Sequence, residues 1–183
     1  MRSSVIAITC VLLIGGCKSA QVSDPLMVDL AGNDPESQME FWYQLGDRRL
    51  VSNDAAFHAL LLFLENEDPV QTYEARVEVL KSRGMLPLNF DRPADDAVHR
   101  GNLAVAICRI LEIKGGVVMR VFKPSRRYAV RELVYLGIYP LSSSYQTFSG
   151  GDFVALIGRM EDNQRVRGVP DPPLPQEELP AGG

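Results

Sequence analysis

The apolar positions of this chain follow a helical period in several separate stretches. Three stretches place apolar residues at i, i+3, i+4 and i+7, the spacing of one face of an amphipathic helix. They begin at Asn53, His99 and Ser149, of which Asn53 and Ser149 are good predicted N-caps and His99 is a poorer one. The aligned apolar residues are Phe57, Leu60, Leu61 and Leu64; Leu103, Ala106, Ile107 and Ile110; and Phe153, Leu156, Ile157 and Met160.

A shorter apolar stripe precedes each of these helices and leads to a glycine. Seven and four positions before Gly46, Gly84 and Gly137 stand Met39 and Trp42, Val77 and Leu80, and Val130 and Leu133. A glycine at this place fits the left-handed residue that follows a helix, where a side chain would be strained. The pattern therefore predicts an all-α fold of three repeats, each a helix, a glycine turn, a loop and a second helix.

The repeats are predicted at about 38–66, 72–113 and 126–162, inside a folded domain spanning 38–166. The β-rich segment GGVVMRVFKP lies between the second and third repeats, and it fits either a short β segment near 116–122 or an extended connector. Residues 167–183 are rich in proline and are expected to form a disordered tail.

The N-terminal residues have the pattern of an export signal. The apolar run at 5–14 is too short to span a bilayer and fits the central region of a secretory signal. It ends in LIGGC, which resembles a bacterial lipobox and implies that residues 1–16 are removed and that Cys17 is lipidated. An ordinary cleaved signal, with Cys17 incidental, is the alternative. A multiply acylated cysteine anchors a protein stably, because each buried methylene contributes ~0.8 kcal/mol.

The polar residues 17–37 are then expected to form a lipidated N-terminus and a flexible tether that lifts the domain off the membrane. Lys18 follows the lipidated cysteine, and this resembles the pattern of lipoproteins sent to an outer membrane. The expected location is therefore the periplasmic or surface face of that membrane.

The order of helix, glycine turn, loop and capped helix resembles the S-layer homology (SLH) domain, whose second helices open with Thr-Arg-Ala-Glu-Phe. The corresponding segments 53–57, 99–103 and 149–153 are degenerate, and among them only Arg100 keeps the arginine. The resemblance covers about 38–162. It implies non-covalent binding of envelope polysaccharide, often anionic, in grooves between repeats, through Arg100, Gly84 and Gly137. On the residues alone, Arg100 could equally pair with Asp95 or Asp96.

A basic cluster could serve the same function. Arg120, Lys123, Arg126, Arg127 and Arg131 gather around Tyr128 on a chain of net charge −4. They fit either contact with anionic glycan or phospholipid headgroups, with Arg126 and Arg127 as candidate ligand-binding residues, or a solvated connector. The acidic balance of the chain argues against nucleic-acid binding.

Aromatic residues offer a further surface for sugar rings. Tyr43, Tyr135 and Tyr139 fit either stacking on a sugar or packing at the rim of the core. Trp42 is expected to pack, because it occupies the same column as Leu80 and Leu133.

The sequence carries no recognisable catalytic motif. His58 and His99 are the only histidines and lack metal-ligand spacing, and Asp91, Asp95 and Asp96 do not match a calcium loop. There is no nucleophile elbow, phosphate-binding loop or dinucleotide fingerprint. We therefore expect a noncatalytic protein without metal or cofactor that binds envelope glycan or, alternatively, a protein-interaction scaffold without glycan affinity. Cys108 is expected in the core.

Overall fold

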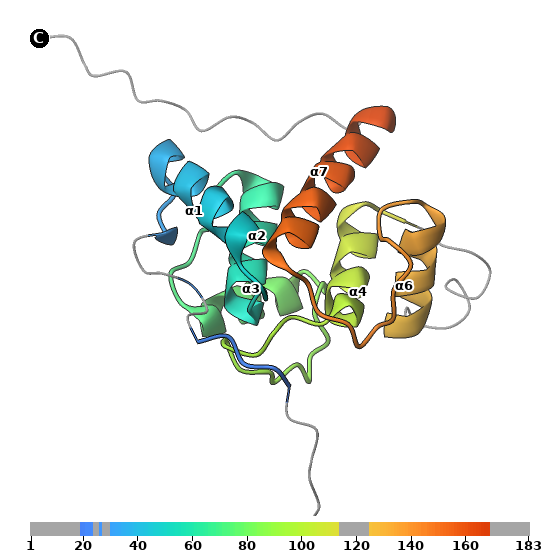
Figure 1. Cartoon of the computed structure of the whole chain (residues 1–183), viewed down its shortest axis with the longest axis horizontal. Coiled ribbons are helices and arrows are strands. Elements are labelled where there is room, and N and C mark those ends of the chain that lie inside the picture. The colour runs from blue at the N-terminus through green and yellow to red at the C-terminus, as the bar shows by residue number, and fades with distance from the viewer. Residues whose placement is uncertain (1–18, 24–25, 27–29, 114–124, 169–183) are drawn as a thin grey trace, which may run out of the picture.

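The computed structural model describes residues 19–23, 26, 30–113 and 125–168, and within these residues the chain is all-α. The helices in chain order are α1 (Pro35–Asp47), α2 (Asn53–Glu65), α3 (Tyr73–Ser82), α4 (Arg100–Ile110), α6 (Arg126–Tyr135) and α7 (Gly150–Val166) (Figure 1). Extended pairing in the described residues is limited to isolated bridges. The expected all-α class is confirmed for these residues. The expected β segment near 116–122 and the tail from residue 169 lie outside them.

Most helices begin at a side chain that accepts a hydrogen bond from the first turn. Ser149 caps α7 as predicted, and His99 makes no side-chain cap bond at α4. The predicted cap at Asn53 is wrong. Ser52 is the cap, because its Oγ accepts from the amide of Ala55 at 3.1 Å, and the Asn53 side chain instead donates to the carbonyl of Pro93 at 2.8 Å.

Two of the three predicted helix-ending glycines adopt the left-handed conformation. Gly84 has φ +66° and Gly137 has φ +73°, as the sequence pattern predicts. Gly46 does not, because α1 continues to Asp47 and is followed by Arg48 in an extended conformation. The apolar stripe of α1 shifts with its end: Phe41 and Leu45 are buried, whereas Met39, which was expected in the stripe, is 69% exposed.

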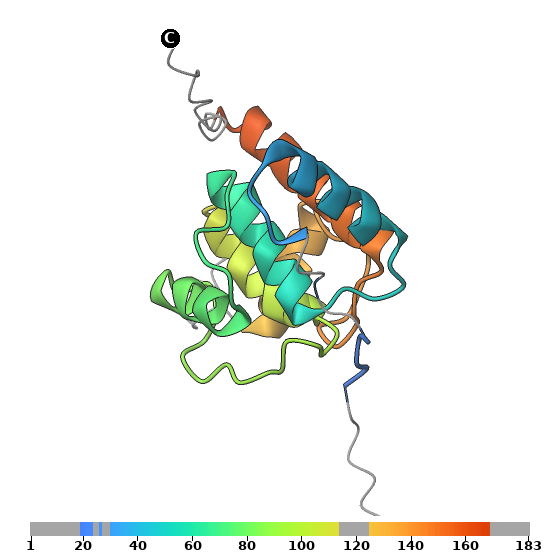
Figure 2. The same cartoon turned by 90° about the vertical axis from the view of Figure 1, so that its left-hand side faces the viewer.

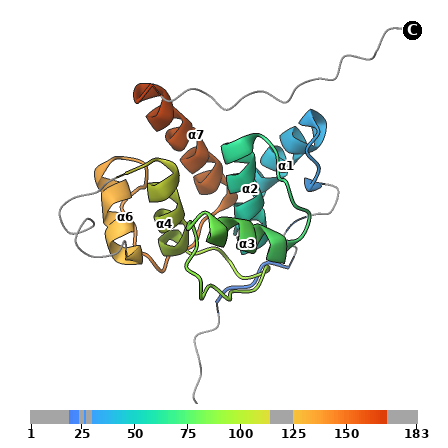
Figure 3. The same ribbon diagram turned by 180° about the vertical axis from the view of Figure 1, so that it is seen from behind.

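The helices pack in pairs that cross the predicted repeat boundaries. Helix α3 packs on α2, α6 packs on α4, and α1 at the start of the helical region packs on α7 at its end. Figure 2 shows α1 and α7 lying side by side. Figure 3 shows α3 next to α2, on the side of the molecule away from α1 and α7. The arrangement is therefore closed, since the first and last helices cover each other.

A ring of backbone hydrogen bonds lies where α2, α4 and α7 begin. The first residue of each of these helices donates its amide to a carbonyl that precedes another of them. The bonds join Asn53 N to Asp96 O (2.9 Å), Arg100 N to Gln146 O (2.7 Å) and Gly150 N to Arg48 O (2.7 Å). Two further bonds reinforce the ring, from Val98 N to Val51 O (2.8 Å) and from Val51 N to Phe148 O (3.1 Å). Three helix starts are thereby fixed around one centre.

The core surrounds this ring. Helix α2 is buried on nearly all sides and forms the centre of the apolar cluster. Its burial is therefore greater than the single apolar face in the sequence predicts. Cys108 of α4 is buried in the same cluster, as expected. Burial and, to a smaller degree, the charge of Glu132 raise the pKa of the Cys108 thiol to about 12, so it is an unreactive core residue.

The expected flexible tether at 17–37 is wrong for much of its length. Ala20 and Val22 form backbone hydrogen bonds with Ala97 and Asp95. Leu30 is buried in the core, and α1 already begins at Pro35. The described residues 19–23 and 30–37 therefore belong to the domain rather than to a spacer.

We expect the substitution Gly150→Ala to destabilise the fold strongly. An added Cβ would lie 1.7 Å from the carbonyl oxygen of Leu45, a backbone atom that moves only if α1 moves. Overpacking of this kind costs about 3 kcal/mol, and urea unfolding followed by circular dichroism would measure the loss. The matched control is Gly158→Ala in the same helix, where an added Cβ meets nothing within 4 Å. The control should gain up to about 1 kcal/mol, and equal effects of the two substitutions would contradict the close approach.

Candidate functional site

Arg100, the arginine implied by the SLH resemblance, is buried and bonded to residues near the start of α7. Its side chain is 9% exposed, its Nε donates to the carbonyl of Thr147 at 3.1 Å, and its Nη2 pairs with Asp152 Oδ2 at 3.0 Å. Its guanidinium carbon also lies 4.6 Å from the centroid of the Phe148 ring. The alternative prediction, that Arg100 pairs with Asp95 or Asp96, is wrong, because its partner is Asp152. Arg100 joins the start of α4 to the start of α7, and these bonds occupy its Nε and Nη2 donors within the domain.

The two glycines named with Arg100 serve helix ends rather than a shared groove. An added Cβ at Gly84 would lie 2.0 Å from Nη1 of Arg109, whereas Gly137 has open space around it. Gly137 follows the C-terminal end of α6, and Arg126 begins the same helix. A ten-residue helix separates its ends by about 15 Å. The predicted ligand-binding residues therefore do not converge on one site.

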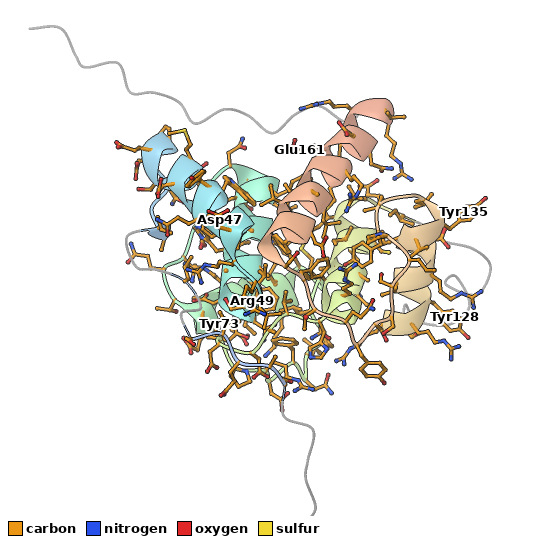
Figure 4. All side chains as sticks on the ribbon, in the orientation of Figure 1. Asp47, Arg49, Tyr73, Tyr128, Tyr135 and Glu161 are labelled. Atoms are coloured by element: carbon orange, nitrogen blue, oxygen red, sulfur yellow. The ribbon has the colours of Figure 1, made fainter. Side chains whose placement is uncertain are left out.

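The outer face of α6 is the predicted basic region that does remain exposed. Ala129, Val130 and Leu133 face the core. The opposite face carries a cationic and aromatic row, which we call the α6 stripe, formed by Arg127, Tyr128, Arg131 and Tyr135. Figure 4 shows Tyr128 and Tyr135 pointing outward at the edge of the molecule.

The charges of the α6 stripe are not neutralised by ion pairs within the described part of the chain. Among the described residues no ion pair involves Arg126, Arg127 or Arg131, and Tyr135 is 85% exposed. Cationic guanidinium groups that alternate with exposed phenol rings can donate to anionic oxygens and stack on a sugar ring. The other basic residues of the predicted cluster, Arg120 and Lys123, lie outside the described residues.

The remaining candidate aromatics divide between packing and exposure. Trp42 packs against the core with its ring centroid 5.1 Å from that of Phe41, as expected. Tyr139 is buried and its hydroxyl donates to the carbonyl of Arg100 at 3.2 Å, so it is excluded as a sugar platform. Tyr43 on α1 is 71% exposed and remains accessible.

A buried charged network joins α2 to α3, and the sequence analysis missed it. His58 Nδ1 lies 2.6 Å from Asp68 Oδ2, the same oxygen accepts from Arg76 Nε at 2.5 Å, and Arg76 Nη1 donates to Asp54 Oδ1 at 2.8 Å. His58, Asp68 and Arg76 are almost completely buried. Asp54 and His58 stand four apart on one helix, which was a visible signal. Their partners Asp68 and Arg76 meet them only through the fold.

The network shifts the pKa values of its two carboxyl groups in opposite directions. Burial alone would raise the pKa of Asp68, but hydrogen bonds from His58 and Arg76 outweigh burial and lower that pKa below its ordinary value. Burial raises the pKa of Asp54, and this effect exceeds the attraction of Arg76. Asp68 is therefore the carboxylate that supplies the negative charge opposite Arg76 most readily.

A cleft of about 350 Å³ opens beside this network. Asp54, Gln71, Tyr73 and Arg76 line its polar side, and Leu26, Ala31 and Gly32 complete it. The Tyr73 hydroxyl already donates to the carbonyl of Arg92 at 2.6 Å, and its ring stacks on Phe57 with centroids 5.9 Å apart. Burial raises the pKa of the Tyr73 hydroxyl, so this group stays protonated. The cleft can hold a small hydroxylated group, but His58 does not line it.

The described residues hold no group of three or more histidine, cysteine, aspartate or glutamate side chains that could bind a metal ion. In the same part of the chain, no helix has both the length and the apolar content needed to cross a membrane.

Comparisons with known proteins find no matching family model, no matching curated protein and no matching solved structure.

We expect Asp68→Asn to destabilise the protein in a pH-dependent manner. The folded-state pKa of Asp68 lies below the ordinary value of 3.8, so its stabilisation is fully present above that value and is lost as the pH falls through the folded-state pKa. Removing one partner of a buried charged network costs about 3 kcal/mol at about pH 7. Urea unfolding should show a smaller difference between wild type and variant at about pH 3. The exposed control Asp162→Asn should change little, and a pH-independent loss in Asp68→Asn would contradict the assignment.

Proposed function

We propose that this protein is a noncatalytic, lipid-anchored envelope protein whose three SLH-like repeats bind envelope polysaccharide or peptidoglycan-associated glycan. Cys17 carries the lipid anchor, and the α6 stripe is the main glycan-binding surface. Arg100, Gly84 and Gly137 support the framework instead of contacting the ligand, while Arg126 and Arg127 remain ligand-binding candidates.

The helical arrangement supports a repeated origin. The three helix starts at Ser52, His99 and Ser149 hold equivalent places in the hydrogen-bonded ring. Aligning the chain on these caps shifts the first repeat by one residue, so that Asn53, rather than Asp54, corresponds to Arg100. In the first helices of the repeats, Leu45 is the counterpart of Leu80 and Leu133, because all three are buried in the last turns of their helices.

The exposed α6 stripe is the single observation that carries the glycan proposal. An acidic chain whose α6 stripe carries exposed tyrosines, and arginines with no ion pair among the described residues, retains a surface suited to anionic, ring-containing ligands. Charge-assisted hydrogen bonds from arginine supply attraction, and tyrosine rings supply contact area at low conformational cost. Because the stripe is solvent-exposed, its affinity should weaken as the salt concentration rises.

The alternative function is a membrane-anchored scaffold that binds protein and not glycan. The exposed Met39 and Tyr43 on α1 favour it, because they stand four residues apart on one helical face and bury little within the domain. In that case α1, rather than α6, is the surface on which substitutions weaken binding.

We expect Arg131→Gln to weaken binding of the soluble chain, residues 19–183, to an anionic envelope polysaccharide. One hydrogen bond to a charged group contributes about 1.5–3 kcal/mol, so the loss should be roughly tenfold or more in Kd. Co-sedimentation with purified envelope glycan, followed by calorimetry on a soluble fragment, would measure it.

Matched controls separate the stripe from general charge and surface effects. Arg165→Gln on α7 removes an equal charge, and Tyr43→Ala is the counterpart of Tyr135→Ala because both tyrosines are exposed. Neither control should change binding, whereas Tyr135→Ala should weaken it. If the wild type shows no glycan binding, the glycan proposal fails. Loss of binding to a protein partner in Tyr43→Ala would then support the scaffold.

A further inference from the structure

Residues 19–23, which follow Cys17 closely in the sequence, are attached to the centre of the domain. The amide of Val22 donates to Asp95 O and the amide of Ala97 donates to Ala20 O, both at 2.7 Å, so that Gln21 and Asp96 form an antiparallel bridge. Ala97 also bridges to Ser52, the cap of α2. The N-terminal segment thus lies as an additional extended layer on the ring that positions α2, α4 and α7.

A side-chain contact extends this attachment toward Cys17. Arg92 Nη1 donates to Ser19 Oγ at 3.1 Å, and the same nitrogen lies 3.7 Å from Asp96 Oδ2. Cys17 precedes Ser19 by two positions in the sequence. Two residues of extended backbone span at most about 7 Å, so a lipid attached at Cys17 has its attachment point close to Ser19.

We propose that the domain is held directly on the membrane in one orientation, with the face formed by Ser19 and the loop at 87–94 against the lipid headgroups. This inference rests on the proposed lipidation of Cys17. It reverses the expected role of the N-terminal segment, because a segment built into the domain fixes its orientation and does not lift it away from the bilayer.

The composition of this face indicates what holds it there. Leu88 projects from the loop with 84% of its surface exposed, and the loop also carries Asp91 and Arg92. An acidic and a basic side chain on the same loop provide no net attraction to anionic lipid. The covalent anchor is therefore the main attachment, and the orientation should form on uncharged lipid.

The opposite end of the molecule points away from the anchored face. In Figures 1, 2 and 3 the N-terminal segment and the loop that precedes α4 lie at the bottom, and the C-terminal end of α7 lies at the top. Figure 4 places Glu161 near that upper end. Helix α7 has 17 residues and is therefore about 25 Å long, which separates the two ends by much more than the reach of the anchor.

The experiment uses the full acylated chain in vesicles of phosphatidylcholine that carry a spin label on a fraction of the headgroups. A fluorophore is attached at Leu88→Cys in one sample and at Glu161→Cys in the other. Cys108 is buried with a pKa of about 12, so it does not compete for the label. Quenching should be severalfold stronger at position 88 than at position 161.

Two variants test the cause of that difference. A Gly/Ser insert of about 20 residues between Lys18 and Ser19 has a reach of about 25 Å and should bring the two quenching values together. Val22→Pro removes the amide that donates to Asp95 O and should reduce the difference in part. Circular dichroism of each variant verifies that the helices are retained.

The outcomes separate the anchor from the orientation. Mass spectrometry of the N-terminal peptide reports acylation, and an unmodified Cys17 overturns both the proposed anchor and this inference. An acylated Cys17 with equal quenching at positions 88 and 161 overturns the orientation and leaves the anchor intact. Strong quenching at position 88 that survives the Gly/Ser insert also overturns the inference, because the loop would then bind lipid by itself.

Discussion

The rest of the structure depends on the backbone ring that joins the starts of α2, α4 and α7. The first amides of a helix have no partner inside that helix, so they must find one elsewhere or remain unsatisfied. Here each helix takes a carbonyl from the segment that leads into another. These three hydrogen bonds together position the starts of α2, α4 and α7 relative to one another. The close approach at α7 also explains why residue 150 must be a glycine, since Leu45 O occupies the place of a side chain there.

The ring brings the partly positive N-termini of three helices close together. Their mutual repulsion explains why acidic side chains lie nearby. Acidic residues near a helix start contribute about 0.3–1 kcal/mol each. Asp54 and Asp152 stand in the first turns of α2 and α7, whereas α4 has no acid there and begins with Arg100. The pairing of Arg100 with Asp152 offsets that deficiency. An arginine that matches a binding motif in sequence is therefore explained in this protein by local helix electrostatics.

The helices and two of the three glycine turns could be predicted from the sequence, because period and cap chemistry act locally. Gly84 and Gly137 need a left-handed residue at a helix end, and the pattern states that requirement directly. Gly46 was misassigned because a preceding apolar stripe identifies a helix but not its last residue. Cap identity failed by one residue, since Ser52 and Asn53 are both good caps and tertiary contact with Pro93 decided between them.

The candidate site was less predictable, because burial depends on which distant segments meet. No periodicity reveals that Arg100 lies over Phe148 or that Arg76 reaches both Asp54 and Asp68. The outward direction of Arg127 and Arg131 follows from the helical spacing of their apolar neighbours, so that part of the surface was visible in advance. Pairing of residues 20–22 with 95–97 had no local signal at all.

The packing of α1 on α7 has a consequence for how the molecule reaches its folded state. Helix α1 is synthesised early, but it can pack on α7 only after the far end of the chain has been made, so this closing contact joins segments more than a hundred positions apart. Contacts of such large sequence separation slow folding. An incomplete chain therefore leaves α1 without its contacts to α7 until synthesis of α7 is finished.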